Sequence, residues 1–377
     1  MPNKNNEFIL IEPFRRRYEH LDFLQSILSG LIQKKSKLIF WTSKPYFSAL
    51  EYKFRKQIDF QELKFDDTLV GIQRFFFSLC NTLAIILKNR KKNILVLSSL
   101  PVVSLIICLF SYLFNLKNIH LVINGELTCL ASKRSSLSIK FDKLSCILFL
   151  KIGMNNGRIL IISEKIYRDI RSDLKPHRSV TFIEPIGFFH NPLREKTIKK
   201  NTCINFLSLG VQNVYKNSFE FNKLALTLNK NLSQKRIMFN VLGKIDFEPG
   251  FVKSVNVLNR NQNKLLDIKD FKDVASKNHY LIFFLDETKY RYVASGSFFD
   301  ALKYNLPILA LKNSFFDFYF SKFGSIGYLC SDIDEMVNLI NDPKKLLKEY
   351  KSKIKNLSEA RKYMSQRFLK SALFTSA

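Results

Sequence analysis

The sequence has few glycines, few prolines and few acidic residues for its length. Its 377 residues include 12 glycines and 10 prolines, and this scarcity argues against an all-β protein, whose many turns need both residue types. Asp and Glu number 32 against 60 Lys and Arg, which gives a net charge of +28. Such a surface attracts anions, so the favoured partners are nucleic acid, anionic lipid or phosphate-bearing substrates.

Cysteine patterns that hold metals or disulfide frameworks are also missing. None of the six cysteines belongs to a CxxC pair and most lie in apolar runs, so we predict buried free thiols in a reducing compartment. No other constellation of metal ligands is present, and we predict neither a metal nor a cofactor. Residues 1–7 contain no apolar signal core, which favours a cytoplasmic location.

One uncharged stretch, residues 94–114, is just long enough to cross a bilayer. Ser98, Ser99 and Pro101 interrupt its apolar run, so we favour a strand at residues 94–97 and then a helix that begins at Pro101. A membrane span and a helix that lies in the membrane surface are the alternatives.

The chain does contain a regular alternation of strands and helices. Apolar strands are predicted at residues 8–12, 38–41, 94–97, 120–123, 159–162, 180–183, 204–209, 237–242, 280–285 and 308–311, with a short extended segment at 326–329. Helices are predicted at residues 21–32, 46–54, 70–87, 101–114 and 163–170, after Asn217, after Ser297, and from Pro343 onward. This alternation predicts an α/β protein with two doubly wound, Rossmann-like domains that face each other across a cleft.

The boundary between the predicted domains falls in residues 185–202. Two prolines, a glycine and a basic run give this segment the composition of a linker. We therefore predict a first domain at residues 1–185, a linker at 186–202, a second domain at 203–357, and a C-terminal helix at 358–377 that packs back on the first domain.

The best candidate site lies within residues 290–307. There a strand is followed by Ser295, Gly296 and Ser297, which open a helix. Free N–H groups at the start of a helix bind phosphate, and Gly296 allows a ligand to approach the backbone closely. Asp300, one turn later, can accept hydrogen bonds from both hydroxyls of a ribose. The alternative is an ordinary capping box of Ser297 and Asp300.

This segment resembles the donor-binding motif of GT-B glycosyltransferases, in the large family that includes sucrose synthase and many cell-surface sugar transferases. The shared features are the Gly-rich turn, an acidic residue before Ala301, and Pro307 before a strand of small apolar residues. That family often carries two glutamates at a fixed spacing, and here Tyr292 takes the first position and Asp300 the second. The resemblance implies a ribose contact for Asp300 and does not decide between an inverting and a retaining mechanism.

Two further segments resemble the donor domain of the same family. Gly210 ends the strand at 204–209, and Lys216 precedes a helix capped by Asn217; the resemblance implies that Lys216 neutralises the donor diphosphate, although a solvent-facing lysine is the alternative. Gly243 and Lys244 follow the next strand, at a position that lies near the nucleotide in the family. The full predicted donor-binding set is Gly210, Lys216, Gly243, Lys244, Tyr290, Arg291, Ser295, Gly296, Ser297 and Asp300.

Two residues of the first domain are candidates for a catalytic base. His20 follows the first strand and begins a helix, as a histidine does in several inverting GT-B enzymes, and Glu126 follows another strand after a glycine. A capping or surface histidine and a surface turn glutamate are the alternatives. Arg15, Arg16 and Arg17 either hold a lipid diphosphate or form a solvated run.

The resemblance implies a metal-independent, hexosyltransferase-like enzyme that moves a sugar from a nucleotide-sugar donor to a growing, lipid-linked cell-surface glycan such as capsule, lipopolysaccharide or exopolysaccharide. The first domain would bind the acceptor and the second the donor. Basic residues flank apolar ones at Lys133, Arg134, Lys140 and Lys143 around Leu137, Ile139, Phe141 and Leu144. This pattern favours a peripheral position on an anionic membrane surface, the inner face of the cell membrane. The alternatives are a nucleic-acid-binding protein, for which no recognisable motif is present, and a catalytically inactive sugar-binding or nucleotide-binding homologue.

Overall fold

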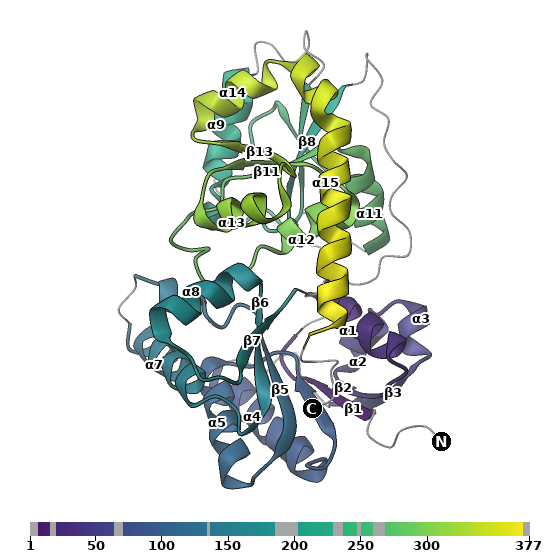
Figure 1. Ribbon diagram of the computed structural model, residues 1–377, viewed down its shortest axis with the longest axis vertical. Coiled ribbons are helices and arrows are strands. Elements are labelled where there is room, and N and C mark those ends of the chain that lie inside the picture. The colour runs from purple at the N-terminus through teal and green to yellow at the C-terminus, as the bar shows by residue number, and fades with distance from the viewer. Residues whose placement is uncertain are drawn as a thin grey trace. The chain divides into compact units, whose positions relative to one another are not determined.

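The computed structural model describes residues 7–15, 20–63, 71–133, 136–184, 203–228, 237–246, 250–258 and 268–371. The chain forms two compact units, each built on one parallel sheet (Figure 1). The first unit comprises Met1–Phe188, Tyr292–Ala294 and Met364–Ala377, and the second comprises Phe189–Arg291 and Ser295–Tyr363. The predicted linker at 186–202 lies outside the described residues, and the predicted domain boundaries stay predictions.

Among the described residues, the sheet of the first unit has seven parallel strands in the order β3-β2-β1-β4-β5-β6-β7. The strands are β1 Glu7–Glu12, β2 Lys37–Thr42, β3 Ile58–Glu62, β4 Asn93–Val96, β5 Lys117–Ile123, β6 Asn156–Ile162 and β7 Val180–Ile183. The helices are α1 Leu21–Gln33, α2 Lys44–Ser48, α3 Tyr52–Arg55, α4 Gly71–Lys88, α5 Pro101–Leu113, α6 Thr128–Ala131, α7 Leu137–Ile152 and α8 Glu164–Leu174.

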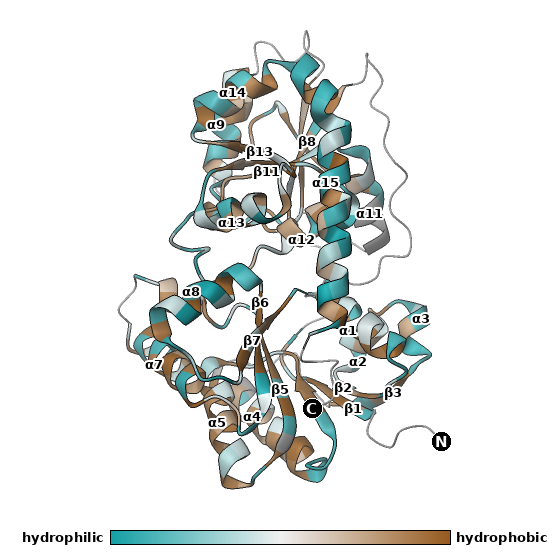
Figure 2. Cartoon of the chain, viewed as in Figure 1, coloured by the Kyte–Doolittle hydropathy of each residue, from teal (hydrophilic) through white to brown (hydrophobic). Residues whose placement is uncertain are grey.

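The strand order explains why helices cover both faces of this sheet. Crossovers between parallel strands are right-handed, so helices change face when the chain reverses its direction along the sheet. One large core lies on the side of α4, α5, α7 and α8, where Ile9, Ile94 and Ile119 of the sheet pack with Ile107 of α5 and Phe149 of α7. Figure 2 shows strand β6 mostly in hydrophobic colours, as burial on both faces of a parallel sheet requires.

The second unit repeats this architecture with a sheet in the order β10-β9-β8-β11-β12-β13. Its strands are β8 Ile204–Leu209, β9 Ile237–Leu242, β10 Val255–Val257, β11 Tyr280–Phe283, β12 Ile308–Leu311 and β13 Gly327–Cys330. Its helices are the 3₁₀ turn η1 Val214–Lys216, α9 Ser218–Leu228, α11 Ile268–Lys277, α12 Gly296–Tyr304, α13 Ser314–Phe323, α14 Ile333–Ile340 and α15 Pro343–Leu369. The predicted α/β architecture of two doubly wound domains is confirmed.

Aromatic side chains form much of the core of the second unit. Phe206, Phe239 and Tyr280 stack across neighbouring strands with ring centroids 5.5–5.6 Å apart. The buried Tyr280 hydroxyl donates to the Leu346 carbonyl at 2.9 Å, so a side chain of β11 also fixes the first turns of α15. The high Phe content of the sequence therefore serves packing.

The uncharged stretch at residues 94–114 forms strand β4 and helix α5, as predicted. Pro101 occupies the first turn of α5, where its missing N–H leaves no intrahelical hydrogen bond unmade. Within the described residues, no helix combines the length and the apolarity that crossing a membrane requires.

Several local predictions are wrong. The single helix predicted at residues 46–54 is two short helices, because α2 starts at a cap in which Ser43 accepts from the Tyr46 N–H at 3.4 Å, and the chain then turns to bury Leu50. Strands β3 and β10 and helices α7, α11 and α13 had no predicted counterpart. Cys80 is exposed rather than buried, although Cys108, Cys146 and Cys330 are buried free thiols as predicted.

Candidate functional site

The polar cluster of the first unit lies at the switch point of its sheet, which is the place where the strand order reverses. From β1 the chain moves outward to β2 and β3, and then returns to place β4 on the other side of β1. The helices that follow β1 and β4 therefore diverge to opposite faces, and a crevice for ligands opens at the carboxyl ends of these strands. Glu12 ends β1, Ser98 and Ser99 follow β4, and Asn124 and Glu126 follow β5.

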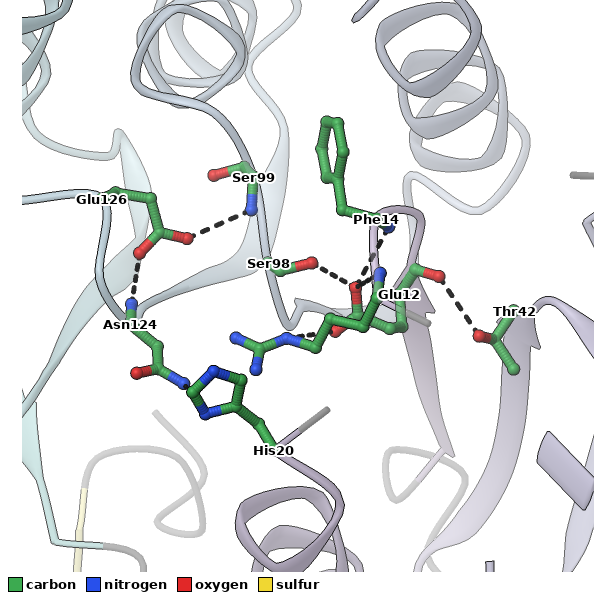
Figure 3. A network of polar contacts seen from close by, with 9 residues as sticks. Glu12, Phe14, His20, Thr42, Ser98, Ser99, Asn124 and Glu126 are labelled. Atoms are coloured by element: carbon green, nitrogen blue, oxygen red, sulfur yellow. Dashed lines mark hydrogen bonds and ion pairs between the residues drawn. The ribbon is translucent and has the colours of Figure 1, made fainter. Parts of the chain in front are cut away.

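Glu12 anchors this cluster. The side chain is buried, and one carboxylate oxygen accepts from the Phe14 and Arg15 N–H groups at 3.2 Å and from the Ser98 hydroxyl. The other oxygen lies 3.1 Å from Arg15 Nε. Burial raises the pKa of Glu12, while the Arg15 charge and these hydrogen bonds oppose the rise. Figure 3 shows Glu12 between Phe14, Ser98 and Thr42. In the sequence, its position at a strand end was the only sign of this role.

Glu126, a predicted base, lies in the same cluster. Its carboxylate accepts from the Asn124 N–H and, at 3.3 Å, from the Ser99 N–H. Burial raises its pKa to about 7, against the lowering effect of these N–H groups and of the Arg15 charge. The thiols of Cys129 and Cys146 donate to the Glu126 carbonyl at 3.3 and 3.5 Å, which fixes the turn. A carboxyl group that titrates near neutral pH suits proton transfer.

His20, the other predicted base, contacts Asn124 at the edge of the same cluster. The Asn124 amide donates to His20 Nδ1 at 3.2 Å, so the neutral ring carries its hydrogen on Nε2. Desolvation by the surrounding atoms, and then the Arg15 charge, lower the pKa of His20 to about 3, although the residue itself is exposed. Its backbone has φ 51°, and its side chain makes no capping hydrogen bond to α1. The contact with Asn124 therefore replaces the capping role considered as an alternative.

The structure thus brings both predicted base candidates to one switch point, with Asn124 between them (Figure 3). They differ in basicity, because a carboxyl group with a pKa near 7 accepts a proton at neutral pH far more readily than an imidazole with a pKa near 3. Arg16 and Arg17 lie outside the described residues.

The second unit has a matching switch point between β8 and β11. Gly210 directly follows β8 with φ 88° and Gly243 directly follows β9 with φ 138°, conformations that glycine adopts without strain. A Cβ at Gly243 would lie 2.1 Å from the Gly210 carbonyl oxygen, so these turns touch. The Lys244 carbonyl accepts from the Gln212 N–H at 2.8 Å, which continues the pairing beyond the strands.

Lys216 and Ser297 meet at this switch point. The Lys216 ammonium donates to the Leu209 carbonyl at 2.6 Å and to the Ser297 hydroxyl at 3.2 Å, and that hydroxyl donates to the Leu209 carbonyl at 3.0 Å. Burial lowers the pKa of Lys216 to about 8, and the charge of Asp300 partly opposes this. The solvent-facing alternative for Lys216 is therefore wrong, and Lys216, Ser297 and Asp300 form one electrostatic cluster.

Two predicted helix caps are wrong. Ser297 lies inside the first turn of α12, whose N-cap residue is Ser295, so Ser297 and Asp300 do not form a capping box. Asn217 has φ 50°, and its side-chain amide donates to the Phe284 carbonyl at 2.7 Å, because Asn213 caps η1 just before it. The Asn217 side chain therefore ties α9 to β11, next to the site.

The remaining predicted donor residues lie on the segment from β11 to α12. The Ser295 hydroxyl is buried and has no hydrogen-bond partner among the described residues, while a Cβ at Gly296 would meet open space. Burial raises the pKa of Tyr290 to about 12, and Arg291 follows it in the same turn. Tyr292 belongs to the first unit, where its hydroxyl donates to Asp173 at 2.6 Å.

Gln212 is a site residue that the sequence did not reveal. Its buried amide donates to the Gly210 carbonyl at 3.0 Å and accepts from the Ser208 hydroxyl at 2.9 Å. It thereby fixes the glycine turn that faces Lys216. Across the described parts of both units, no group of three His, Cys, Asp or Glu side chains is arranged to hold a metal ion.

No protein-family model matches the chain, and no curated protein matches it. Solved structures do match. A glycosyltransferase from Rickettsia africae is 11% identical with a TM-score of 0.56, covering 98% of each chain. UDP-GlcNAc 2-epimerase from Neisseria meningitidis, bound to UDP-GlcNAc, is 12% identical with a TM-score of 0.52, covering 97% of this chain and all of that one. TarM is 14% identical with a TM-score of 0.50, and this chain spans 59% of its length.

The chain has the GT-B glycosyltransferase fold. These neighbours share two Rossmann-like domains with it, as the sequence resemblance implied. At such low identities the likeness concerns the fold alone, and the GT-B fold serves both a transferase and an epimerase among the neighbours. The function of this GT-B protein therefore has to be argued from its own residues.

Proposed function

We propose that this GT-B protein is a glycosyltransferase that moves a sugar from a nucleotide-sugar donor to a growing, lipid-linked glycan of the capsule, lipopolysaccharide or exopolysaccharide type. The convergence of Lys216, Ser297 and the start of α12 at the end of β8 carries the proposal. A partly buried cation, a hydroxyl and free helix N–H groups together suit a diphosphate. The UDP-GlcNAc-bound epimerase and the Rickettsia transferase, which have the same fold, support this assignment.

The donor half of the mechanism depends on electrostatics. As the sugar leaves, negative charge develops on the diphosphate, and Lys216 and the amino terminus of α12 stabilise it. Asp300, whose charge acts on Lys216, accepts hydrogen bonds from the ribose hydroxyls. Gly210 and Gly243 let the backbone approach the nucleotide closely. Because fixed protein charges perform this work, the proposed enzyme needs no bound metal.

The acceptor half requires a base, since a sugar hydroxyl is a poor nucleophile at neutral pH. We assign this role to Glu126, because its pKa near 7 leaves a substantial ionised fraction that also remains basic. His20, whose Nδ1 accepts from Asn124, is a positioning residue in this scheme. Removal of the proton by Glu126 as the hydroxyl attacks the sugar corresponds to inversion of configuration.

The lipid-linked acceptor and the membrane association are supported by the outer surface of α5 and α7. The α5–α7 face is the exposed apolar set Leu109, Leu113, Leu137, Phe141 and Leu144. The two helices pack side by side, and the hydroxyl of Tyr112 at the end of α5 donates to the Ile152 carbonyl at 3.0 Å. Exposed apolar side chains on two neighbouring helices are typical of an interaction site.

The charge around this face favours a membrane surface as the partner. Lys140 and Lys151 project from the same exposed side of α7 as Leu144, and Lys133 precedes the helix. Apolar side chains flanked by lysines bind anionic bilayers through burial of the former and attraction of the latter. We therefore propose a peripheral location on the inner face of the cell membrane.

The enzymatic proposal is tested by thermal shift against a panel of nucleoside diphosphates, followed by assays for transfer from the nucleotide sugar that binds. A bound nucleotide raises the melting temperature by mass action. Release of the nucleoside diphosphate together with a glycosylated lipid acceptor is the expected result. Isomerisation of the nucleotide sugar without acceptor would identify an epimerase, and nucleotide binding without turnover an inactive homologue. Salt-dependent DNA binding without nucleotide binding would favour a nucleic-acid-binding protein.

A further inference from the structure

Arg15 is a buried cation whose hydrogen-bonding capacity is only partly used. The residue is 9% exposed, and its Nε lies 3.1 Å from Glu12 Oε2. Its Nη1 has no hydrogen-bond partner among the residues that the structure describes. A guanidinium carries five N–H donors, and a buried donor left unpaired is costly. Such an atom calls for an explanation.

The surrounding structure holds the guanidinium in place. Glu12, its ion-pair partner, accepts from the Ser98 hydroxyl and from the Phe14 N–H and is itself buried. Since both members of the pair are buried and Glu12 is anchored on two strand ends, Arg15 cannot turn outward without leaving an unpaired carboxylate behind. The unpaired Nη1 is therefore a fixed feature of this switch point.

Further donors lie close to this nitrogen. The Arg15 charge lowers the pKa of both Glu126 and His20. Asn124 uses one amide hydrogen on His20 Nδ1 and retains a second, and the neutral His20 ring carries a hydrogen on Nε2. Arg15, Asn124 and His20 thus add N–H donors to the polar cluster that contains Glu126. The unesterified oxygens of a phosphate group match such a set of donors.

We propose that Arg15 binds a phosphate group carried by the acceptor, next to the hydroxyl that Glu126 deprotonates. This inference rests on the proposed function and adds the chemical class of the acceptor. The same chemistry has two possible sources, a phosphate attached to a lipid and a free phosphate. Binding through Arg15 also aligns the acceptor, because a bidentate guanidinium fixes the orientation of its anion as well as its position.

The test compares farnesyl phosphate, farnesol and inorganic phosphate by isothermal titration calorimetry on the full-length protein. The Lys216→Ala background weakens anion binding at the proposed donor site. We expect farnesyl phosphate to bind about tenfold to a hundredfold more tightly than farnesol, the range for a hydrogen bond to a charged group. Saturable binding of inorganic phosphate that depends on Arg15 supports a free-phosphate source, and binding of farnesyl phosphate alone supports a lipid-borne one.

The variants separate binding from folding. Arg15→Gln alone leaves Glu12 buried without its partner and risks unfolding, so the decisive variant is Glu12→Gln/Arg15→Gln, which removes both charges together. Trp41, the single tryptophan of the chain and part of β2, reports by fluorescence whether the first unit stays folded. The phosphate preference should vanish in the folded double variant and be reduced in Arg15→Lys, which keeps the charge and loses the planar fork.

The inference is overturned if farnesyl phosphate and farnesol bind alike, or if the preference survives in the folded double variant. Failure of the proposed function gives a different pattern. If the phosphate preference depends on Arg15 and no sugar is transferred from any nucleotide sugar, the phosphate site stands and the transferase assignment falls. If sugar is transferred and the transfer does not depend on Arg15, the transferase assignment stands and the phosphate site falls.

Discussion

Each of the two switch points holds an ionisable group whose pKa is shifted by burial, and the two groups have opposite charges. In the first unit burial raises the pKa of a carboxyl group, Glu126, to about 7, and in the second it lowers the pKa of an amine, Lys216, to about 8. Each site therefore moves one ionisable group toward neutral pH by desolvating it. Backbone groups then hold the side chain, through the Ser99 and Asn124 N–H groups in one case and the Leu209 carbonyl in the other.

The difference between the sites lies in what each can do for a substrate. The first combines carboxylates, a neutral histidine and a partly satisfied arginine, and in the proposed function it moves a proton. The second presents a cation and helix N–H groups, and in the proposed function it binds and neutralises an anion. Groups with strongly shifted pKa values at strand ends are typical of functional sites, and the contrast between them suggests separate roles for the two units.

The variant Glu126→Gln should have the largest effect on the difference between the two switch points. A general base contributes a factor of about 100 to 10,000 in rate, so we expect turnover to fall at least about a hundredfold while nucleotide affinity stays unchanged. For the native protein, kcat/KM should rise with pH through about 7, as the carboxyl group ionises. Steady-state kinetics over pH 5–9 checks both statements.

Glu62→Gln is the matched control for this variant. Glu62 also ends a strand of the same sheet, but β3 is the edge strand and lies away from the switch point. It should retain full turnover. His20→Ala should lose less than Glu126→Gln, because His20 accepts a proton poorly. Near-normal turnover in Glu126→Gln would remove the base assignment and favour a retaining mechanism.

The donor site is tested by Lys216→Ala, whose main effect should fall on binding. Loss of a charged hydrogen-bonding partner costs about 1.5–3 kcal/mol, so nucleoside diphosphate affinity should fall roughly tenfold to a hundredfold. Lys312→Ala serves as the control, since Lys312 follows β12 at the same edge of the sheet and is exposed.

Asp300→Ala should also weaken nucleotide binding far more than it lowers folding stability, because Asp300 is not part of a helix cap.

The pH dependence of this binding follows from the lowered pKa of Lys216. Only the protonated amine pairs with a diphosphate, so affinity should fall as pH rises through about 8. The Lys216→Ala variant should show no such decline over pH 7–9.5. An equal decline in both proteins, measured by calorimetry, would show that another group is responsible.

The sequence predicted the elements that depend on local patterns. Strands of continuous apolar residues, such as those ending at Glu12 and Leu209, were located to within a residue or so. A strand that is buried on both faces has apolar side chains at consecutive positions, a pattern that solvent-exposed segments lack. Strand β3, with the sequence IDFQE, lies at the sheet edge and is only partly buried. Its apolar content was too low for detection.

The site was predictable in so far as strand ends mark it, and unpredictable where contacts join distant segments. Lys216 and Ser297 are 81 residues apart, and His20 and Asn124 are 104 apart, so no local pattern relates them. The same limit explains the errors at Asn217 and Ser297. Their spacing to an acidic residue suggested capping boxes, but tertiary partners, the carbonyls of Phe284 and Leu209, bind these side chains instead.

A smaller difference between the units is the exposed apolar α5–α7 face, which we propose as the membrane-binding surface of the first unit. The double variant Leu113→Ser/Phe141→Ser tests its role. Full burial of each apolar side chain in a lipid surface is worth about 1.5–3 kcal/mol, and partial insertion less, so binding to vesicles with anionic lipid should weaken about tenfold. Leu226→Ser, an exposed leucine of α9 in the second unit, is the control and should bind normally. High salt should release the native protein, since it screens the lysines. Release only by detergent would contradict the peripheral mode.

The last prediction isolates the stability cost of the raised Glu126 pKa. A carboxyl group with a folded-state pKa near 7 and an unfolded value near 4.5 keeps its proton more tightly in the folded protein. Stability is therefore lost as pH rises from about 4.5 through 7. Glu126→Gln cannot ionise, so the variant should gain stability relative to the native protein by about 1–2 kcal/mol between pH 4.5 and 8, after discounting for the partial exposure of the side chain. Urea unfolding followed by Trp41 fluorescence measures this difference within the first unit, and groups common to both proteins cancel. A difference that stays constant with pH would mean that Glu126 has the same pKa in the folded and unfolded protein. The first switch point would then lack the raised pKa that distinguishes it from the second.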